Sequence, residues 1–154
     1  MSSDFMRARV SQELEDVLRE MMTPREYLKG ATILRQGMPV DGLYLVETGE
    51  VRVLLATAEN QNQLLEVVGA GCLLGLSDSM AGGSYRITAE AAEPTTAAFL
   101  EREIFLEFLS GHQEYCMQVV RLLSDSLHRL YHKFRDVNAQ PGRPRRRSPN
   151  ELLS

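Results

Sequence analysis

The sequence predicts a mainly β protein with flanking helices: an eight-stranded antiparallel jelly-roll barrel followed by a long C-terminal helix. Short apolar or alternating runs follow one another from residue 27 to residue 100, and turn residues such as Asp41-Gly42 and Gly82-Gly83 separate them. No long helical pattern lies between these runs, so the strands are expected to pair antiparallel rather than through parallel crossovers. From residue 101 onward the apolar residues take helical spacing.

The first element is a helix, and residues 1–23 are assigned to an N-terminal helical segment. Its apolar residues lie at helical spacing: Val10, Leu14, Val17, Leu18 and Met21. Ser11 is placed to cap the first turn, because its hydroxyl can accept a hydrogen bond from a free backbone N–H. Pro24 ends the helix, since proline disfavours helical geometry in the residue before it.

Residues 24–110 are assigned to the barrel, which is expected to be the sensor domain. Seven or eight strands are expected, and seven runs are candidates for them: 32–34, 43–46, 51–55, 64–68, 72–74, 85–92 and 95–100. The chain has 11 glycines, which suit the many tight turns that such short strands require. Residues 74–81 interrupt the strands and end in Gly82-Gly83, which predicts one or two helical turns with a glycine stop.

A short helix over residues 101–109 and a long helix within residues 111–138 complete the fold. The long helix carries an apolar seam at alternating spacings of four and three: Cys116, Val120, Leu123, Leu127, Leu130, Phe134 and Val137. A second stripe accompanies its first half: Tyr115, Val119 and Leu122. Two stripes predict that the helix contacts both its own barrel and a partner helix, so we expect a parallel homodimer. The alternative is a helix packed wholly against its own domain.

Charge is unevenly distributed along the chain. It contains 17 Lys and Arg and 21 Asp and Glu, a net charge of −4. Residues 139–154 are expected to form a flexible basic tail, in which four arginines face only Glu151: Arg143, Arg145, Arg146 and Arg147. The tail carries +3, so the rest of the chain carries −7, which makes it a poor partner for a phosphate backbone.

The two cysteines and the hydropathy pattern exclude several classes of protein. Cys72 and Cys116 form no closely spaced pair, so neither a zinc ribbon, a disulfide framework nor an iron–sulfur cluster is indicated. The longest weakly charged stretch, residues 67–76, is far shorter than the ~20 apolar residues that span a bilayer. No basic and apolar leader opens the sequence, so a cytoplasmic location is expected.

A series of short motifs follows the predicted strands in a fixed order. These are Lys29-Gly30, Arg35-Gln36-Gly37, residues 41–46, residues 48–51, Gly69-Ala70-Gly71, Gly75 and residues 86–89. In order and spacing they resemble the sensor domain of the cAMP receptor protein/FNR family of transcription regulators, which has the cyclic nucleotide-binding fold. The resemblance covers about residues 10–138.

The resemblance implies a phosphate-binding segment over residues 75–89, formed by a glycine turn, a short helix and the following strand. The candidate ligand-binding residues are Gly75, Leu76, Ser77, Asp78, Arg86, Ile87, Thr88, Leu130 and Tyr131. The N-terminal amides of the short helix and the Arg86 guanidinium would meet an anionic group. Leu76 stands where the family has a glutamate that accepts from the ribose hydroxyl, and Ile87 replaces a small residue.

These departures point away from ordinary cAMP binding. Leu130 and Tyr131 take the place of polar residues that meet the purine in the family. The expected ligand is a cyclic nucleotide or another small anion, and an apolar wall that includes Leu76 and Ile87 favours one acidic group on a hydrophobic body. Two alternatives stay open: a one-residue slip would put Tyr85 in the arginine position, and Arg86 could be a surface arginine on a sheet edge.

The expected function is that of a ligand-sensing regulatory domain rather than an enzyme. Metal-dependent catalysis in the barrel is not expected, because His112, His128 and His132 all follow it. Only 16 residues follow Asn138, too few for a DNA-reading domain, so specific DNA binding by this chain alone is not expected. The signal would pass to an unknown partner protein, or the chain is a domain of a longer regulator. The competing interpretation is a degenerate pocket that serves only dimerisation or protein interaction.

Overall fold

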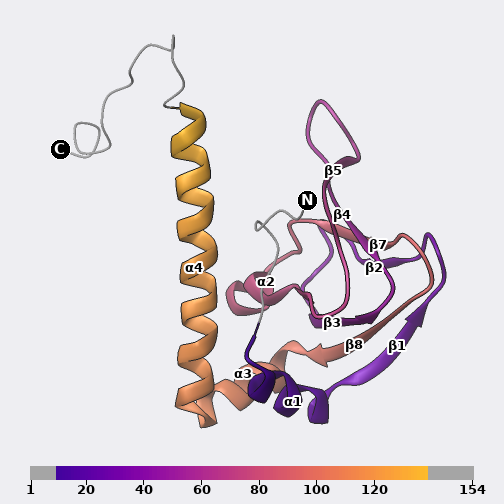
Figure 1. The fold of residues 1–154 in the computed structure, drawn as a ribbon. Helices are drawn as coiled ribbons and strands as arrows, with labels where there is room; N and C mark the ends of the chain where they lie inside the picture. Colours follow the sequence, from indigo (N-terminus) through magenta and orange to yellow (C-terminus); the bar gives the residue numbers. More distant parts are fainter. Residues whose placement is uncertain (1–9, 139–154) are drawn as a thin grey trace.

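The computed structural model describes residues 10–138 and divides them into helices and strands (Figure 1). The helices are α1 (Gln12–Met21), α2 (Leu76–Ala81), α3 (Arg102–Gly111) and α4 (Gln113–Asn138). The strands are β1 (Thr23–Tyr27), β2 (Thr32–Leu34), β3 (Gly42–Thr48), β4 (Val51–Leu55), β5 (Gln63–Val68), β6 (Leu73–Leu74), β7 (Thr88–Ala91) and β8 (Thr95–Glu101). The expected basic tail, residues 139–154, lies outside the described residues.

The eight strands pair as the two arms of one long hairpin would, so that the first strand lies beside the last. β1 pairs with β8, β2 with β7, β3 with β6 and β4 with β5, and each pairing is antiparallel. Folding this hairpin gives two four-stranded sheets, β1-β8-β3-β6 and β2-β7-β4-β5, the arrangement of a double-sheet jelly roll. The predicted antiparallel β fold with flanking helices is confirmed. The predicted jelly-roll barrel consists of these two separate four-stranded sheets, with no pairing that joins them into one closed sheet among the described strands.

Two apolar cores lie on the two faces of the β1-β8-β3-β6 sheet. β3 shows this directly, since alternate residues of a strand point to opposite faces. Tyr44 and Val46 join the core between the sheets, whereas Leu43 and Leu45 join the core beneath the helices. All four are at most 2% exposed, so β3 is buried on both faces.

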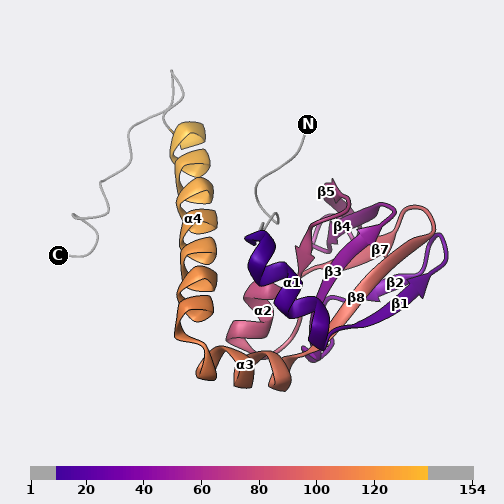
Figure 2. The ribbon, with the colours of Figure 1, turned by 60° about the horizontal axis from the view of Figure 1, so that its bottom comes forward.

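Helices α1, α2 and α3 cover the outer face of that sheet (Figure 2). Leu14 and Leu18 of α1 and Phe105 of α3 are at most 1% exposed in the core beneath the helices. The predicted Ser11 cap is confirmed, because its Oγ accepts a hydrogen bond from the Leu14 N–H at 3.2 Å. The same hydroxyl donates to Gln118 Oε1 at 2.9 Å, which joins α1 to α4.

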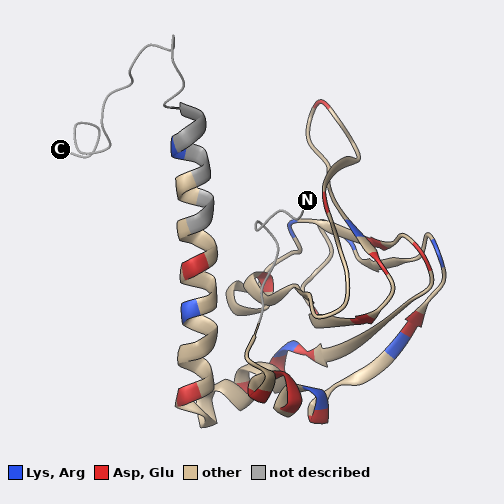
Figure 3. Ribbon diagram, in the orientation of Figure 1, with Lys and Arg blue, Asp and Glu red and all other residues tan. Residues whose placement is uncertain are grey.

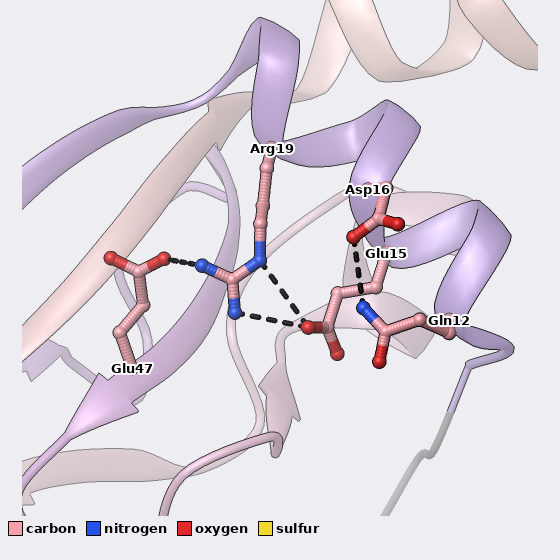
Figure 4. Close-up of polar contacts among 5 residues, drawn as sticks. All are labelled: Gln12, Glu15, Asp16, Arg19 and Glu47. Carbon is pink, nitrogen blue, oxygen red and sulfur yellow. Dashed lines mark hydrogen bonds and ion pairs between the residues drawn. The ribbon is translucent and has the colours of Figure 1, made fainter.

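Arg19 holds α1 against β3 through a network of ion pairs (Figure 4). Its guanidinium contacts Glu15 one helical turn earlier at 3.0 Å and Glu47 of β3 on its other side. The Arg19 side chain is 40% exposed, and exposed ion pairs add little to stability. The network therefore orients α1, while the buried leucines of the helix hold it in place.

α4 has 26 residues, and its C-terminal half stands clear of both sheets in two views (Figures 1 and 2). Its N-terminal half joins the core beneath the helices, where Val119 is 1% exposed and Tyr115 and Leu123 pack beside that core. No helix among residues 10–138 is long and apolar enough to cross a membrane.

Candidate functional site

The segment expected to bind phosphate lies between β6 and β7 and begins at a glycine that the backbone requires. Gly75 has φ +83° and caps the N-terminus of α2. A Cβ at this position would lie 3.0 Å from the Gly42 carbonyl oxygen and 3.4 Å from Tyr85 Cε1, so only glycine lets α2 approach β3 this closely. α2 ends where the Gly82 N–H donates to Asp78 O at 2.7 Å, which confirms the short, glycine-stopped helix.

Tyr85 anchors the segment that leads from α2 back into the sandwich. It is 4% exposed, and its hydroxyl lies 2.5 Å from Asp41 Oδ1 and 2.6 Å from Gly42 O. The hydroxyl oxygen also accepts from the Gly42 N–H at 3.1 Å. Burial, together with the hydrogen bond to Asp41, raises the pKa of Tyr85 well above its ordinary value. Tyr85 thus fastens the site segment to the start of β3, a role that the sequence pattern did not indicate.

Tyr85→Phe is expected to lower the free energy of unfolding by about 1–3 kcal/mol, because the buried backbone of Gly42 loses its partner. The raised pKa of Tyr85 also makes this stabilisation depend on pH. The unfolded chain releases the Tyr85 proton first, so this stabilisation is complete below about pH 10 and is lost as the pH rises above that value. Urea unfolding at about pH 8 and about pH 11 measures both effects. An equal alkaline loss in the parent and in Tyr85→Phe would contradict this assignment.

Arg86 lies on the exposed side of the segment between α2 and β7, and it pairs with Asp78 of α2. Tyr85 and Ile87 are buried in the sandwich, whereas the Arg86 side chain is 83% exposed. Arg86 Nε lies 3.8 Å from Asp78 Oδ1, and the Arg86 backbone N–H donates to Asp78 Oδ2 at 3.3 Å. The Asp78 side chain is only 10% exposed. The candidate anion-binding arginine therefore already faces a carboxylate.

The two apolar candidates of this segment belong to different cores. Leu76 is 3% exposed and packs beneath the helices, whereas Ile87 is 5% exposed and packs between the sheets. The expected single wall that contains both side chains is therefore not formed. Thr88 lies in β7, where its Oγ1 accepts from the Gln36 N–H at 2.9 Å, and Ser77 is exposed on α2.

The two remaining candidates, Leu130 and Tyr131, belong to α4. Tyr131 is 52% exposed, and its ring contacts that of His132 at a centroid distance of 6.0 Å. The side chain of Leu130 lies outside the part of α4 that the structure describes. Within residues 10–138 no group of three or more His, Cys, Asp or Glu could hold a metal ion. The structure thus brings Arg86 into contact with Asp78, in the helix that begins after Gly75.

A family model described as "Cyclic nucleotide-binding domain" matches residues 24–112, which is more than half of the chain. The chain therefore belongs to the cyclic nucleotide-binding domain family. The match includes the whole segment from Gly75 to Thr88, and the resemblance seen in the sequence is confirmed.

Crp-like regulators are among the relatives of this chain. The "CRP-like cAMP-activated global transcriptional regulator" of Mycobacterium tuberculosis is 23% identical over 141 residues, 89% of this chain and 63% of the relative. The catabolite activator protein of Thermus thermophilus superposes with a TM-score of 0.73 at 26% identity, covering 82% of this chain and 60% of that one. The N-terminal domain of a transcriptional regulator from Streptomyces coelicolor A3(2) has the same fold, with a TM-score of 0.68 at 22% identity over 83% of this chain and 94% of that one. The chain thus spans less than two thirds of the first two relatives and nearly all of the isolated domain.

Proposed function

We propose that this chain is a ligand-sensing regulatory domain that dimerises through α4 and passes its signal to a partner protein or to a further domain. The observation that carries the proposal is Arg86 beside the first turn of α2, within a domain of the cyclic nucleotide-binding family. An arginine in this place can contact the acidic group of a ligand. A cytoplasmic location and a role without catalysis belong to the same proposal.

Ordinary cAMP is not the ligand we propose. The family's acceptor for the ribose hydroxyl is replaced by Leu76, whose side chain is 3% exposed in the core beneath the helices. A hydroxyl left without its acceptor costs about 1–3 kcal/mol, or roughly 5- to 150-fold in affinity. The proposed ligand is a small anion whose acidic group contacts Arg86 and whose remainder is apolar.

A thermal-shift screen of the parent and of Arg86→Ala tests this proposal. A saturating anionic apolar compound, with octanoate as the first probe, is expected to raise the melting temperature by roughly 5–10 °C. Arg86→Ala should lose the shift because it removes the cation that the acidic group contacts. Arg35→Ala is the matched control, since Arg35 is another exposed arginine and its guanidinium donates to Thr32 Oγ1 at 3.4 Å.

A second candidate function, dimerisation or protein interaction without a ligand, is favoured by two observations. Asp78 already faces Arg86, and Ile87 fills the core between the sheets. Both observations favour a degenerate pocket in a domain that serves only dimerisation or protein interaction. This second function is the correct one if no anionic compound shifts the parent, or if Arg86→Ala leaves the shift unchanged.

The proposed dimer rests on the exposed side of α4. Within the predicted seam, Val120 is 45% exposed and Leu127 is 66% exposed, and Met117 adds apolar surface nearby. Cys116 and Leu123 are partly buried against the chain's own core. Three seam side chains lie outside the described part of the helix: Leu130, Phe134 and Val137. An exposed apolar helix face of this kind favours pairing with a second copy of the same helix.

The distribution of charge argues against recognition of a nucleic-acid backbone by the described residues. Figure 3 shows acidic residues along α1, α3 and the start of α4. Exposed carboxylates of these helices include Glu13, Asp16, Glu103, Glu107 and Glu114. Negative charge of this kind repels a phosphate backbone, so specific DNA binding by this chain alone is not part of the proposal.

A further inference from the structure

We propose that Asp78 is the specificity-determining residue of the ligand site, because its carboxylate occupies the anion position beside Arg86. The acidic group of a ligand competes with this carboxylate for the guanidinium. The inference rests on the proposed function, in which Arg86 contacts that acidic group. It implies that the site rejects anions that bring no compensating apolar contact, and that removal of the Asp78 charge opens the site to them.

Both carboxylate oxygens of Asp78 approach Arg86. Its Oδ2 accepts the Arg86 backbone N–H at 3.3 Å, and its Oδ1 lies 3.8 Å from Arg86 Nε. The Asp78 side chain is 10% exposed and the Arg86 side chain is 83% exposed. The carboxylate therefore lies on the buried side of the pair, in the first turn of α2, whereas most of the guanidinium faces solvent.

The Asp78 carboxylate offsets part of the charge that Arg86 presents to a ligand. Arg102 is the second arginine at α2, but its Nε donates to Ser79 O at 2.7 Å and its guanidinium lies near Gly82, at the other end of the helix. A single ion pair with one exposed partner changes an equilibrium constant by a factor of up to about five. Neutralising Asp78 is therefore expected to strengthen anion binding by about two- to fivefold.

The test is a calorimetric titration of the full chain with cAMP, comparing the parent with Asp78→Asn. Asparagine keeps an oxygen that can accept the Arg86 N–H, so the segment keeps its hydrogen bond and loses only the charge. Asp78→Asn should bind cAMP about two- to fivefold more tightly than the parent, and added salt should reduce the gain. Glu90→Gln is the matched control: the Arg52–Glu90 pair has the same 3.8 Å separation but joins β4 to β7, so this variant should bind like the parent.

The double variant Asp78→Asn/Arg86→Ala tests whether the effect of Asp78 depends on Arg86. The gain from Asp78→Asn should vanish in it, because Asp78 acts through the Arg86 guanidinium. A gain that survives without Arg86 overturns the inference. So does an Asp78→Asn protein that is folded by circular dichroism and binds no more tightly than the parent. The proposed function fails on a different measurement, the dependence of the octanoate thermal shift on Arg86 in the parent background.

Discussion

Gly49→Ala is expected to leave the chain without a stable fold, whereas Gly30→Ala, at a similar backbone angle, should remain folded. Gly49 follows β3 and has φ +96°, a region that residues with a side chain rarely adopt. A Cβ there would lie 2.3 Å from Thr95 Oγ1 and 2.6 Å from Pro94 O. Pro94 leads directly into β8, which pairs with both β1 and β3, so this backbone cannot move without disturbing the sheet. Angle and overlap together should cost more than about 4 kcal/mol, against a total stability of about 5–15 kcal/mol.

Gly30→Ala isolates the contribution of the backbone angle. Gly30 has φ +88°, and a Cβ at this position would meet nothing within 4 Å. Its cost should therefore be about 1–3 kcal/mol, the strain of the angle alone. Urea unfolding followed by circular dichroism measures both variants. Equal losses would mean that the Gly49 turn relaxes away from Pro94, and the argument from overlap would be wrong.

Most of the strands could be predicted from their apolar runs, but β1 could not. Four of its five residues are exposed, and it contains Pro24, which reads as the end of a helix. Proline is tolerated there because β1 is an edge strand of its sheet. The partner of β1 is β8, about seventy positions away in sequence, so the pairing depends on how the long hairpin closes rather than on any local pattern.

The site residues could be located from the sequence, but their orientation could not. Gly75 and Arg86 flank α2 as expected, yet Leu76 and Ile87 enter different cores. The path between them passes through Gly82 at φ +80° and Gly83 at φ +88°, and such a turn resets which face of the segment is buried. The contact between Asp78 and Arg86 is a product of that turn, so residue spacing carries no signal for it.

The sequence also does not show which side chains of the α4 heptad seam remain exposed. Spacing identifies its members, but docking of α4 on the rest of the chain decides which of them remain available to a partner. Cys116 and Leu123 lie partly against the chain's own core, while Val120 and Leu127 face outward. The second stripe, represented by Val119, is the one that the body of the protein covers. A test of the proposed dimer should therefore change the outward pair.

Val120→Asp combined with Leu127→Asp is expected to give a folded monomer. In a parallel pair of helices each seam residue lies next to its own copy, so the double change places four carboxylates in one apolar interface. Burying unpaired charges costs several kcal/mol, so the dissociation constant of the dimer should rise by at least about a thousandfold. Sedimentation velocity over a concentration series measures this change.

His128→Asp is the control for this double change, because His128 is exposed beside Leu127 but is not a member of the seam. It should leave the dimer intact. Neither Val120 nor Leu127 belongs to the core beneath the helices, so the double variant should keep the far-ultraviolet spectrum of the parent. If the double variant still sediments as a dimer, the interface lies on another surface. If the parent itself is a monomer, the dimer is removed from the proposal, and the exposed apolar face that includes Val120 and Leu127 favours a partner protein instead.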